Sequence, residues 1–281
     1  MSEPFRAGEP CLLLDAKGRR YLLTLKPGSE FQYHRGILSH ATIIGSREGT
    51  IHHSSKGSRL TALRPRLADY VVKMGRGATV SYPKDSGAIL VWADIGPGQT
   101  VLEAGTGSGG LAMVLARAVI PGGRVVSCER REDHLGHAKG LIAKYYGEIP
   151  EHLDLRLDSV EDVIEEVRPD RMVLDLPEPW HSVEAAAAHM ADGGIFCCYL
   201  PTVPQVQTVR DAISATGRFA EVLTFEMMLR EWAVEGRSVR PSHRMIGHTG
   251  FITVARLIRP EEKPEDPRAQ GSAPDAEKAP Q

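Results

Sequence analysis

One stretch constrains the fold of this 281-residue chain more than any other: Val101-Leu102-Glu103-Ala104-Gly105-Thr106-Gly107-Ser108-Gly109-Gly110. An apolar segment ends there at glycines, which lack a Cβ that would block a ligand, and apolar residues at helical spacing follow from Leu111 to Ala118. A strand, a glycine loop and a helix in this order predict a cradle for a nucleotide. The spacing also fits Gly-x-Gly-x-x-Gly, a pattern that NAD-binding enzymes share.

Glu103 discriminates between the ligands that such a loop binds. A carboxylate two residues before the first glycine suits a cation better than the pyrophosphate of NAD, which prefers bare backbone N–H groups. S-adenosylmethionine is such a ligand, since it carries a sulfonium and an ammonium group and no phosphate. We therefore expect S-adenosylmethionine as the cofactor, with Glu103 facing its amino acid end. The alternative is a structural role for Glu103, holding the loop at the end of the strand.

Beyond the glycine loop, apolar strands alternate with helices. Strands are expected at 124–129, 153–157, 172–174 and 195–199, and helices at 132–146, 160–167, 182–190 and 206–213. This alternation predicts an α/β fold with a parallel, doubly wound sheet, in which ligands bind beyond the carboxyl ends of the strands. Two apolar segments without a helix between them, 220–228 and 251–258, predict an antiparallel pair at the sheet edge, enclosing a polar loop at 237–248.

Four successive strands of this predicted sheet end in an acid, namely Glu103, Glu129, Asp158 and Asp175. Glu129 lies some 24 residues after Gly105 and can accept hydrogen bonds from both ribose hydroxyls of an adenosine cofactor. Asp158 can accept from the exocyclic amine of the cofactor's adenine. Asp175 is left for the substrate.

A proline-rich loop follows the last of these acids, with the sequence Asp175-Leu176-Pro177-Glu178-Pro179-Trp180. Two prolines stiffen it and hold a carboxylate and an indole beside the cofactor. Upstream, Pro83 forces Tyr82 into an extended conformation at the start of the nucleotide-binding fold. Aromatic faces hold unstacked bases and carboxylates accept hydrogen bonds from exocyclic amines, so these residues predict a methyltransferase that acts on a nucleobase.

Charge is unevenly distributed along the chain. Residues 1–80 carry 13 Lys/Arg and 6 Asp/Glu, whereas residues 81–216 carry 11 and 20. A polyanion would bind the basic part, although solvated basic surface is an equally simple explanation. We divide the chain into a small basic β-rich domain at 1–63, a connecting helix at 64–80, a catalytic domain at 81–260 and a disordered tail at 261–281.

Composition excludes several classes of protein. The four cysteines show no C-x-x-C spacing, so neither a zinc site nor a disulfide framework is expected. No apolar run approaches a membrane span, and the first ten residues lack the apolar core of a signal peptide. We expect a cytoplasmic protein without a membrane partner.

Six motifs complete this pattern: Glu-Ala-Gly-Thr-Gly-Ser-Gly at 103–109, Tyr-Pro-Lys-Asp at 82–85, Asp-Leu-Pro-x-Pro-Trp at 175–180, Tyr-Leu-Pro-Thr at 199–202, Val-Arg-Pro-Ser-His at 239–243 and Gly-His-Thr-Gly-Phe-Ile at 247–252. Together they resemble the tRNA (adenine-58-N1)-methyltransferase family in its single-chain prokaryotic form. The resemblance implies a class I methyltransferase-like fold and methyl transfer from S-adenosylmethionine to N1 of an adenine in the tRNA T-loop. It also implies a homotetramer.

The resemblance also assigns roles to residues by position. It makes Asp175 the catalytic acid and Tyr82 a residue that positions the base. The residues expected to bind the cofactor are Glu103, Gly105, Gly107, Ser108, Gly109, Gly110, Glu129, His134, Asp158 and Asp175. Those expected to bind the substrate are Trp180, Tyr199, Arg240, His243 and His248. His134 stands where family members often have arginine.

The expected mechanism follows from the chemistry of adenine. N1 of neutral adenine has a free lone pair, so no base has to remove a proton before methyl transfer. Asp175, hydrogen-bonded to the 6-amino group, would stabilise the positive charge that develops on the purine, and no metal is needed. The alternatives are an NAD-dependent dehydrogenase, a methyltransferase acting on another RNA or on a protein, and a tRNA-binding module without chemistry.

Overall fold

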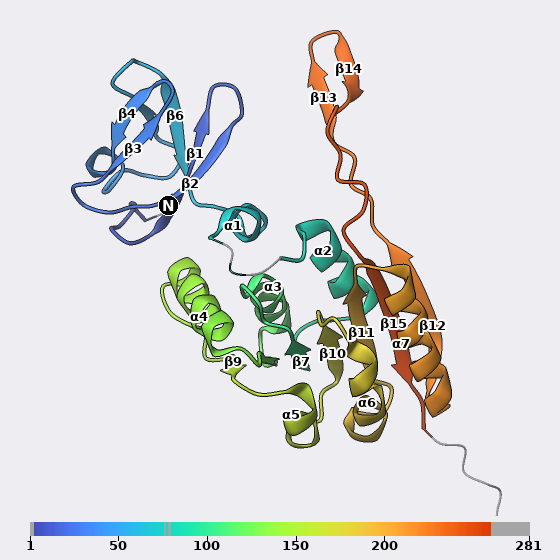
Figure 1. Cartoon of the computed structure of the whole chain (residues 1–281). Helices are drawn as coiled ribbons and strands as arrows, with labels where there is room; N and C mark the ends of the chain where they lie inside the picture. The colour runs from blue at the N-terminus through green and yellow to red at the C-terminus, as the bar shows by residue number, and fades with distance from the viewer. Residues whose placement is uncertain (1–2, 76, 78–79, 260–281) are drawn as a thin grey trace, which may run out of the picture.

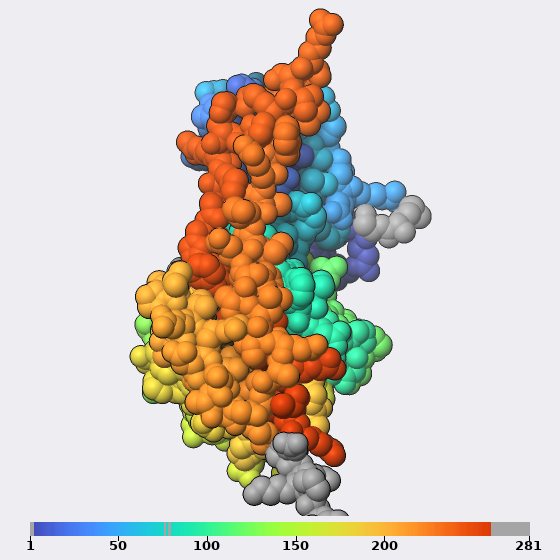
Figure 2. Space-filling view, turned by 90° about the vertical axis from the view of Figure 1, so that its right-hand side faces the viewer, coloured from blue at the N-terminus to red at the C-terminus, as the bar shows by residue number. Residues whose placement is uncertain are grey.

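The computed structural model describes residues 3–75, 77 and 80–259, and the tail expected at 261–281 lies outside this range. Figure 1 shows a small N-terminal β domain, a larger domain of helices around a sheet, and a hairpin that projects from the larger domain. The N-terminal domain and the hairpin lie at the same end of the molecule in both views (Figures 1 and 2).

The N-terminal domain is built on a four-stranded sheet with strand order β2-β1-β6-β5. Its elements are β1 (Pro10–Asp15), β2 (Arg20–Thr24), β5 (Ile51–His53) and β6 (Arg59–Leu63), with β3 (Glu30–Tyr33) and β4 (Gly36–Ser39) forming a separate hairpin and η1 (His40–Thr42) a 3-10 turn. The turn after β1 forms because Asp15 Oδ1 accepts from the backbone N–H groups of Lys17 and Arg19, at 2.9 and 3.0 Å. Phe5, Leu13 and other apolar side chains give this domain a core of its own.

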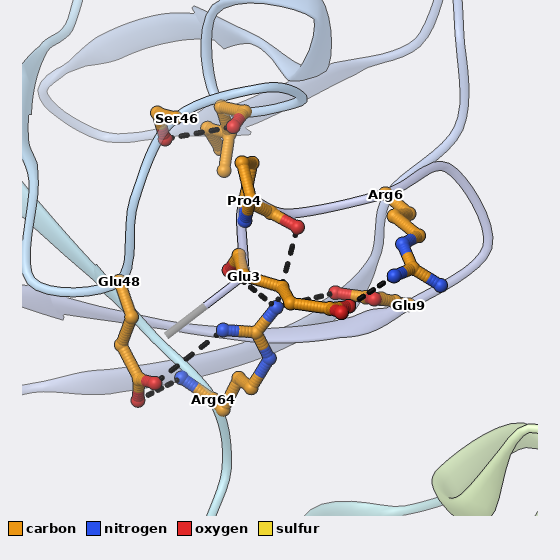
Figure 3. Close-up of polar contacts among 8 residues, drawn as sticks. Glu3, Pro4, Arg6, Glu9, Ser46, Glu48 and Arg64 are labelled. Carbon is orange, nitrogen blue, oxygen red and sulfur yellow. Dashed lines mark hydrogen bonds and ion pairs between the residues drawn. The ribbon is translucent and has the colours of Figure 1, made fainter. Parts of the chain in front are cut away.

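Arg64 ties the first residues of the chain to the end of β6 (Figure 3). Its guanidinium donates to the carboxylates of Glu9 and Glu48, at 3.1 and 3.5 Å. It also donates to the backbone carbonyls of Glu3 and Pro4, at 3.1 and 3.4 Å. These contacts occupy Arg64 inside the domain, so its charge contributes little to any basic surface.

The larger domain is built on a seven-stranded sheet with strand order β12-β15-β11-β10-β7-β8-β9. Five strands run parallel: β7 (Thr100–Ala104), β8 (Arg124–Cys128), β9 (Leu153–Arg156), β10 (Arg171–Leu174) and β11 (Ile195–Leu200). β15 (Phe251–Leu257) runs antiparallel to both β11 and β12 (Phe219–Glu226). The predicted α/β fold, with an antiparallel pair at one edge, is confirmed. The strand order reverses at β7 and β10, which is where ligands bind in such sheets.

Helices pack against both faces of this sheet (Figure 1). One apolar core contains α1 (Leu67–Lys73), α2 (Pro83–Trp92), α3 (Gly110–Val119) and α4 (Glu132–Tyr146), and the other contains α5 (Val160–Val167), α6 (Val183–His189) and α7 (Val203–Thr216). Polar caps start two of them, since Ser159 accepts from an N–H of α5 and Thr202 from an N–H of α7. None of the described helices combines the length and apolar composition needed to cross a bilayer.

Two local features differ from what the residue types suggest. Asp85, a residue type that often caps helices, does not cap α2, because Pro83, which lacks an N–H group, is the first helical residue and Tyr82 is the N-cap. The polar loop contains a strand, β14 (Ser238–Pro241), which pairs with β13 (Trp232–Glu235) in the projecting hairpin. The hairpin forms because Gly236 takes a positive φ of 56° in the two-residue turn between these strands.

Candidate active site

The glycine loop lies directly against the residue that follows β10. Ala104 and Leu174 are partners in the parallel pairing of β7 with β10, so Gly105 and Asp175 leave the sheet side by side. A Cβ on Gly105, whose φ is +92°, would lie 2.2 Å from the carbonyl oxygen of Asp175. Glycine is therefore required here both by the backbone conformation and by the close approach. The loop and Asp175 form one continuous rim.

The second half of the loop starts helix α3. Gly109 is the N-cap with a φ of +80°, and a Cβ on it would lie 2.9 Å from Cδ1 of Ile142 in α4. A Cβ on Gly110 would lie 2.5 Å from a methyl group of Val80. In the described part of the chain no side chain caps this helix, so its first N–H groups are available at the positive end of the helix dipole. Such an end suits the carboxylate of an amino acid ligand.

Glu129 follows β8 and closes the loop from the other side. Its Oε2 accepts from the N–H of Gly107 and its Oε1 from the N–H of Arg131, each at 3.0 Å. Each carboxylate oxygen can accept more than one hydrogen bond, so acceptor capacity remains for ribose hydroxyls. His134 Nδ1 lies 3.9 Å from Glu129 Oε2. Ser108 Oγ meanwhile accepts from the N–H of Gly77 at 3.2 Å, which fastens the loop to the segment before α2.

Glu103 is the penultimate residue of β7, one position before the strand end where the sequence placed it. It is inside β7, opposite Ser127 of β8, and its side chain is fully buried. Ser127 donates to Oε2 and also shares a hydrogen bond of 2.6 Å with Thr106, while Oε1 has no partner among the described residues. Burial raises the pKa of Glu103 to about 8, so the group is predominantly protonated at neutral pH. This geometry fits the structural alternative, in which Glu103 holds the loop from behind.

Asp158 lies apart from the other acids. It is exposed, two residues after the end of β9, and lines a shallow depression of about 440 Å³ with Arg130 and Ser159. Among the described residues, the Asp158 side chain forms no hydrogen bond or ion pair with the glycine loop. Its role toward the adenine of the cofactor stays a prediction.

The carboxylate of Asp175 is half-buried at the centre of the rim. Ser81 Oγ donates to its Oδ2 at 2.9 Å. Burial raises the pKa of Asp175 to about 6, while the hydrogen bond from Ser81 acts in the opposite direction. At neutral pH the group is therefore mainly ionised and can stabilise a positive charge beside the glycine loop.

A buried ion pair that the sequence did not predict lies at the start of α2. Lys84 Nζ lies 2.6 Å from Asp85 Oδ1, and the two side chains are 8% and 0% exposed. Thr249 and Tyr199 donate from their hydroxyls to Asp85 Oδ2, at 2.7 and 3.3 Å, and Lys84 also donates to the carbonyl of Met227 at 2.7 Å. Three motifs of the sequence therefore meet at one cluster. Each motif was visible singly, but no spacing pattern relates residues that lie 164 positions apart.

A groove of about 990 Å³ leads from Tyr82 toward the N-terminal domain. Its walls come from β2, α1, the start of α2 and the segments on either side of the hairpin. The charged residues and the histidine that line it are Arg20, Arg66, Asp69, Lys73, Lys84, Glu231, His243 and Arg244, and its apolar lining includes Val72, Leu229, Met245 and Ile246. Two predicted residues, Tyr82 and His243, therefore share this groove.

Four predicted substrate residues lie outside the groove, and one of them is Tyr199, which is buried in the cluster around Asp85. Trp180, in the 3-10 turn η2 (Pro179–Ser182), packs against the apolar core that contains α5 to α7. Arg240 is exposed on β14, in the projecting hairpin (Figure 1). His248 lies at the base of the hairpin, where hydrogen bonds of 2.9 Å to the carbonyl of Pro201 and to Glu226 raise its pKa.

The chain matches two protein-family models. A model described as tRNA methyltransferase complex GCD14 subunit matches residues 70–244, which is more than half of the chain. A model described as TrmI-like N-terminal matches residues 4–51. The two matches together span both domains.

Individual proteins resemble the chain over nearly its whole length. It is 38% identical to tRNA (adenine(58)-N(1))-methyltransferase TrmI of Thermus thermophilus, over 88% of this chain and 96% of that protein. It is 36% identical to tRNA (adenine(57)-N(1)/adenine(58)-N(1))-methyltransferase TrmI of Methanocaldococcus jannaschii, over 90% and 98% of the two chains.

Solved structures share the fold of both domains. The tRNA (m1A58) methyltransferase TrmI of Aquifex aeolicus superimposes with a TM-score of 0.81 at 25% identity, over 92% of this chain and 100% of that one. A SAM-dependent O-methyltransferase of Thermotoga maritima superimposes with a TM-score of 0.87 at 28% identity, over 93% and 97% of the two chains.

Proposed function

Because this chain belongs to the TrmI/GCD14 family of tRNA methyltransferases, we propose that it methylates N1 of adenine 58 in the T-loop of tRNA. It is an S-adenosylmethionine-dependent enzyme of the methyltransferase fold. The observation that carries the choice of substrate is the position of Asp175, a half-buried carboxylate at the edge of the glycine loop. A carboxylate at this place can accept from the exocyclic amine of an adenine whose N1 faces the methyl donor.

The proposed mechanism uses Asp175 without proton abstraction. S-adenosylmethionine, when bound, supplies a methyl group on a positively charged sulfur. Asp175 accepts a hydrogen bond from the 6-amino group of the base, and its negative charge stabilises the positive charge that develops on the purine. Tyr82, at the inner end of the groove, positions the base, and the rigid turn at Pro83 fixes the direction of its ring. The 6-amino group loses no proton in the step, so the methylated ring is released as a cation.

The residues around the glycine loop fit S-adenosylmethionine. Gly105 and Gly109 lie where any Cβ would collide with neighbouring residues, and the start of α3 offers N–H groups to the carboxylate of an amino acid. Glu129, supported by His134, would accept the ribose hydroxyls, and Asp158 the adenine amine. Glu103 lies behind the loop, and its buried Oε1 remains available for a hydrogen bond because it has no partner among the described residues.

The proposed path of the tRNA follows the groove between the two domains. Arg244 and His243 line it beside Tyr82, and Lys73 of α1 faces them. Arginine and lysine side chains in this arrangement suit phosphates. Exposed Arg240 on the hairpin would extend the contact beyond the groove. Trp180 packs against the apolar core beside the proline loop. We propose that it contributes to substrate binding indirectly, by holding that loop in place.

The hairpin also supports the homotetramer that the family resemblance implies. Trp232, Val234 and Val239 on its two strands are 58%, 68% and 60% exposed. A projecting two-stranded ribbon with apolar side chains in water is stabilised when another subunit covers it. We propose a cytoplasmic homotetramer in which the hairpin takes part in subunit contacts.

Mapping of methylated nucleosides in the T-loop tests the proposed function. A tRNA transcript incubated with the protein and S-adenosylmethionine should gain 1-methyladenosine at position 58, detected by mass spectrometry of T-loop fragments. The same measurement reads position 57, at which the Methanocaldococcus relative also acts. A transcript with another base at position 58 and the Asp175→Asn variant are the controls. Methylation of other RNA or of protein, with the T-loop unmodified, would refute the assignment.

Calorimetry separates the remaining alternatives. We expect S-adenosylmethionine to bind and NADH not to bind. Saturable binding of NADH alone would favour a dehydrogenase. Tight binding of tRNA without any methyl transfer would favour a binding module.

A further inference from the structure

We propose that Ser81 is a positioning residue that presents the carboxylate of Asp175 to the base with one oxygen occupied and one oxygen free. This inference rests on the proposed function, because it assigns a role to Asp175 in holding adenine. Ser81 stands next to Tyr82 in the sequence, but none of the motifs identified above includes it.

The contact is partly buried and joins residues that are far apart in the sequence. Ser81 is 3% exposed, and its Oγ donates to Asp175 Oδ2 at 2.9 Å across 94 positions of sequence. Asp175 Oδ1 accepts no hydrogen bond from the described residues. The carboxylate therefore has one oxygen held by the protein and one open acceptor beside the glycine loop.

The backbone holds Ser81 in place on its carboxyl-terminal side. Tyr82 is extended, with φ −71° and ψ 150°, because Pro83 follows it. The carbonyl of Tyr82 accepts from the N–H groups of Asp85 and Ser86, both at 2.9 Å. Asp85 is in turn fixed by the buried ion pair with Lys84. Successive residues of an extended segment point to opposite sides, so Ser81 reaches Asp175 while Tyr82 lines the groove.

The consequence for catalysis follows from the symmetry of a carboxylate. Without a donor at Oδ2 the group can turn about its Cβ–Cγ bond, and its charge no longer has a fixed direction. With Ser81 in place, Oδ1 alone is directed to the 6-amino group of the base. A single fixed acceptor orients adenine so that N1, and not the amine, meets the methyl donor.

Ser81 also acts on ionisation. Its hydrogen bond lowers the pKa of Asp175, which burial raises to about 6, so its removal moves that pKa upward. Among the described residues, the ionisable groups on which Asp175 acts electrostatically are Glu103 in β7 and Tyr199 in β11, whose own pKa values are raised. Neither is hydrogen-bonded to Ser81 in the described part of the chain. Their titration is thus common to the wild type and to a Ser81 variant.

Single-turnover methylation of tRNA across pH, with saturating tRNA and S-adenosylmethionine, tests the proposal. Ser81→Ala should lower the rate at pH 7 by about tenfold or more, as for a lost hydrogen bond to a charged group. As the pH is lowered, the rate of Ser81→Ala should also begin to fall at a higher pH than the rate of the wild type, because Asp175 is protonated more readily in the variant. Ser81→Thr keeps the hydroxyl and should retain most of the rate.

Ser86→Ala is the matched control. Ser86 is 2% exposed in the first turn of α2, and its hydroxyl has no partner among the described residues. Its loss removes a buried hydroxyl from the same segment without touching Asp175, so rate and pH profile should match the wild type. Equal affinity of the Ser81→Ala and wild-type proteins for S-adenosylmethionine in calorimetry verifies that the variant is folded.

The combination with Asp175→Asn separates this inference from the proposed function. In the Asp175→Asn background, Ser81→Ala should cause no further loss. Two results would overturn the role of Ser81 and leave the proposed function standing. One is a tenfold further loss of rate when Ser81→Ala is added to Asp175→Asn. The other is a Ser81→Ala single variant with the rate and pH profile of the wild type, while Asp175→Asn is strongly impaired. Wild-type activity of Asp175→Asn would overturn both.

Discussion

The buried ion pair at the start of α2 allows a stability prediction of definite size. Lys84 and Asp85 are 8% and 0% exposed, so solvent screens their interaction little. Lys84→Met keeps most of the apolar stem but leaves the charge of Asp85 uncompensated, and it removes the donors to Met227 and Thr249. Breaking one partner of a buried pair costs about 3–5 kcal/mol. We expect the free energy of unfolding to fall by that amount.

Urea unfolding at one fixed protein concentration, followed by circular dichroism, measures this loss. Lys73→Met is the control, because Lys73 is an exposed lysine at the end of α1, and its effect should stay within about 0.5 kcal/mol. Adding Asp85→Asn to Lys84→Met should restore part of the stability, since the stranded charge is the main cause of the loss. A loss below about 1 kcal/mol for Lys84→Met, or no recovery in the double variant, would refute the reasoning.

Three further predictions concern ligands and chemistry. Glu129→Ala should weaken S-adenosylmethionine binding by about 1.5–3 kcal/mol, measured by calorimetry, and unchanged affinity would remove Glu129 from the ribose site. Asp175→Asn should slow single-turnover methylation by about 10²–10³-fold, as for one preorganised electrostatic group, with tRNA binding little changed. Full recovery at high pH would instead indicate proton abstraction. Arg240→Ala and Arg244→Ala should each lower the slope of log K against log salt for tRNA by about one, and a salt-independent wild-type affinity would contradict a phosphate-binding surface.

The sheet and the rim could be predicted from the sequence because both depend on local patterns. Apolar runs, glycines and terminal acids identified β7, β8 and β10, and their parallel pairing brought Gly105, Glu129 and Asp175 to one edge. The residue at which a strand ends is harder to predict, and here the prediction for β7 differed by one residue from the structure. That difference put Glu103 inside β7, opposite Ser127, and not at the strand end.

Contacts between distant segments could not be predicted in the same way. The hydrogen bond from Ser81 to Asp175 and the cluster of Lys84, Asp85 and Thr249 depend on how the start of α2 packs against the sheet and against the segment that precedes β15. Single polar residues in a short segment show no periodicity from which such distant partners could be predicted. The hairpin was missed for a related reason, since its strands contain only four residues each and include charged side chains.

The close packing of Gly105 against the carbonyl of Asp175, where an added Cβ would lie 2.2 Å from the oxygen, has a consequence for protein engineering. The segment that we propose to cradle the methyl donor and the segment that we propose to hold the base cannot move independently, because neither backbone leaves room for the other to shift. A designer who wants a different nucleobase modified should therefore keep both backbones and redesign the walls of the groove, at Tyr82, His243 and Arg244. Libraries that vary the glycine loop would mostly yield proteins that lose donor and acceptor geometry together.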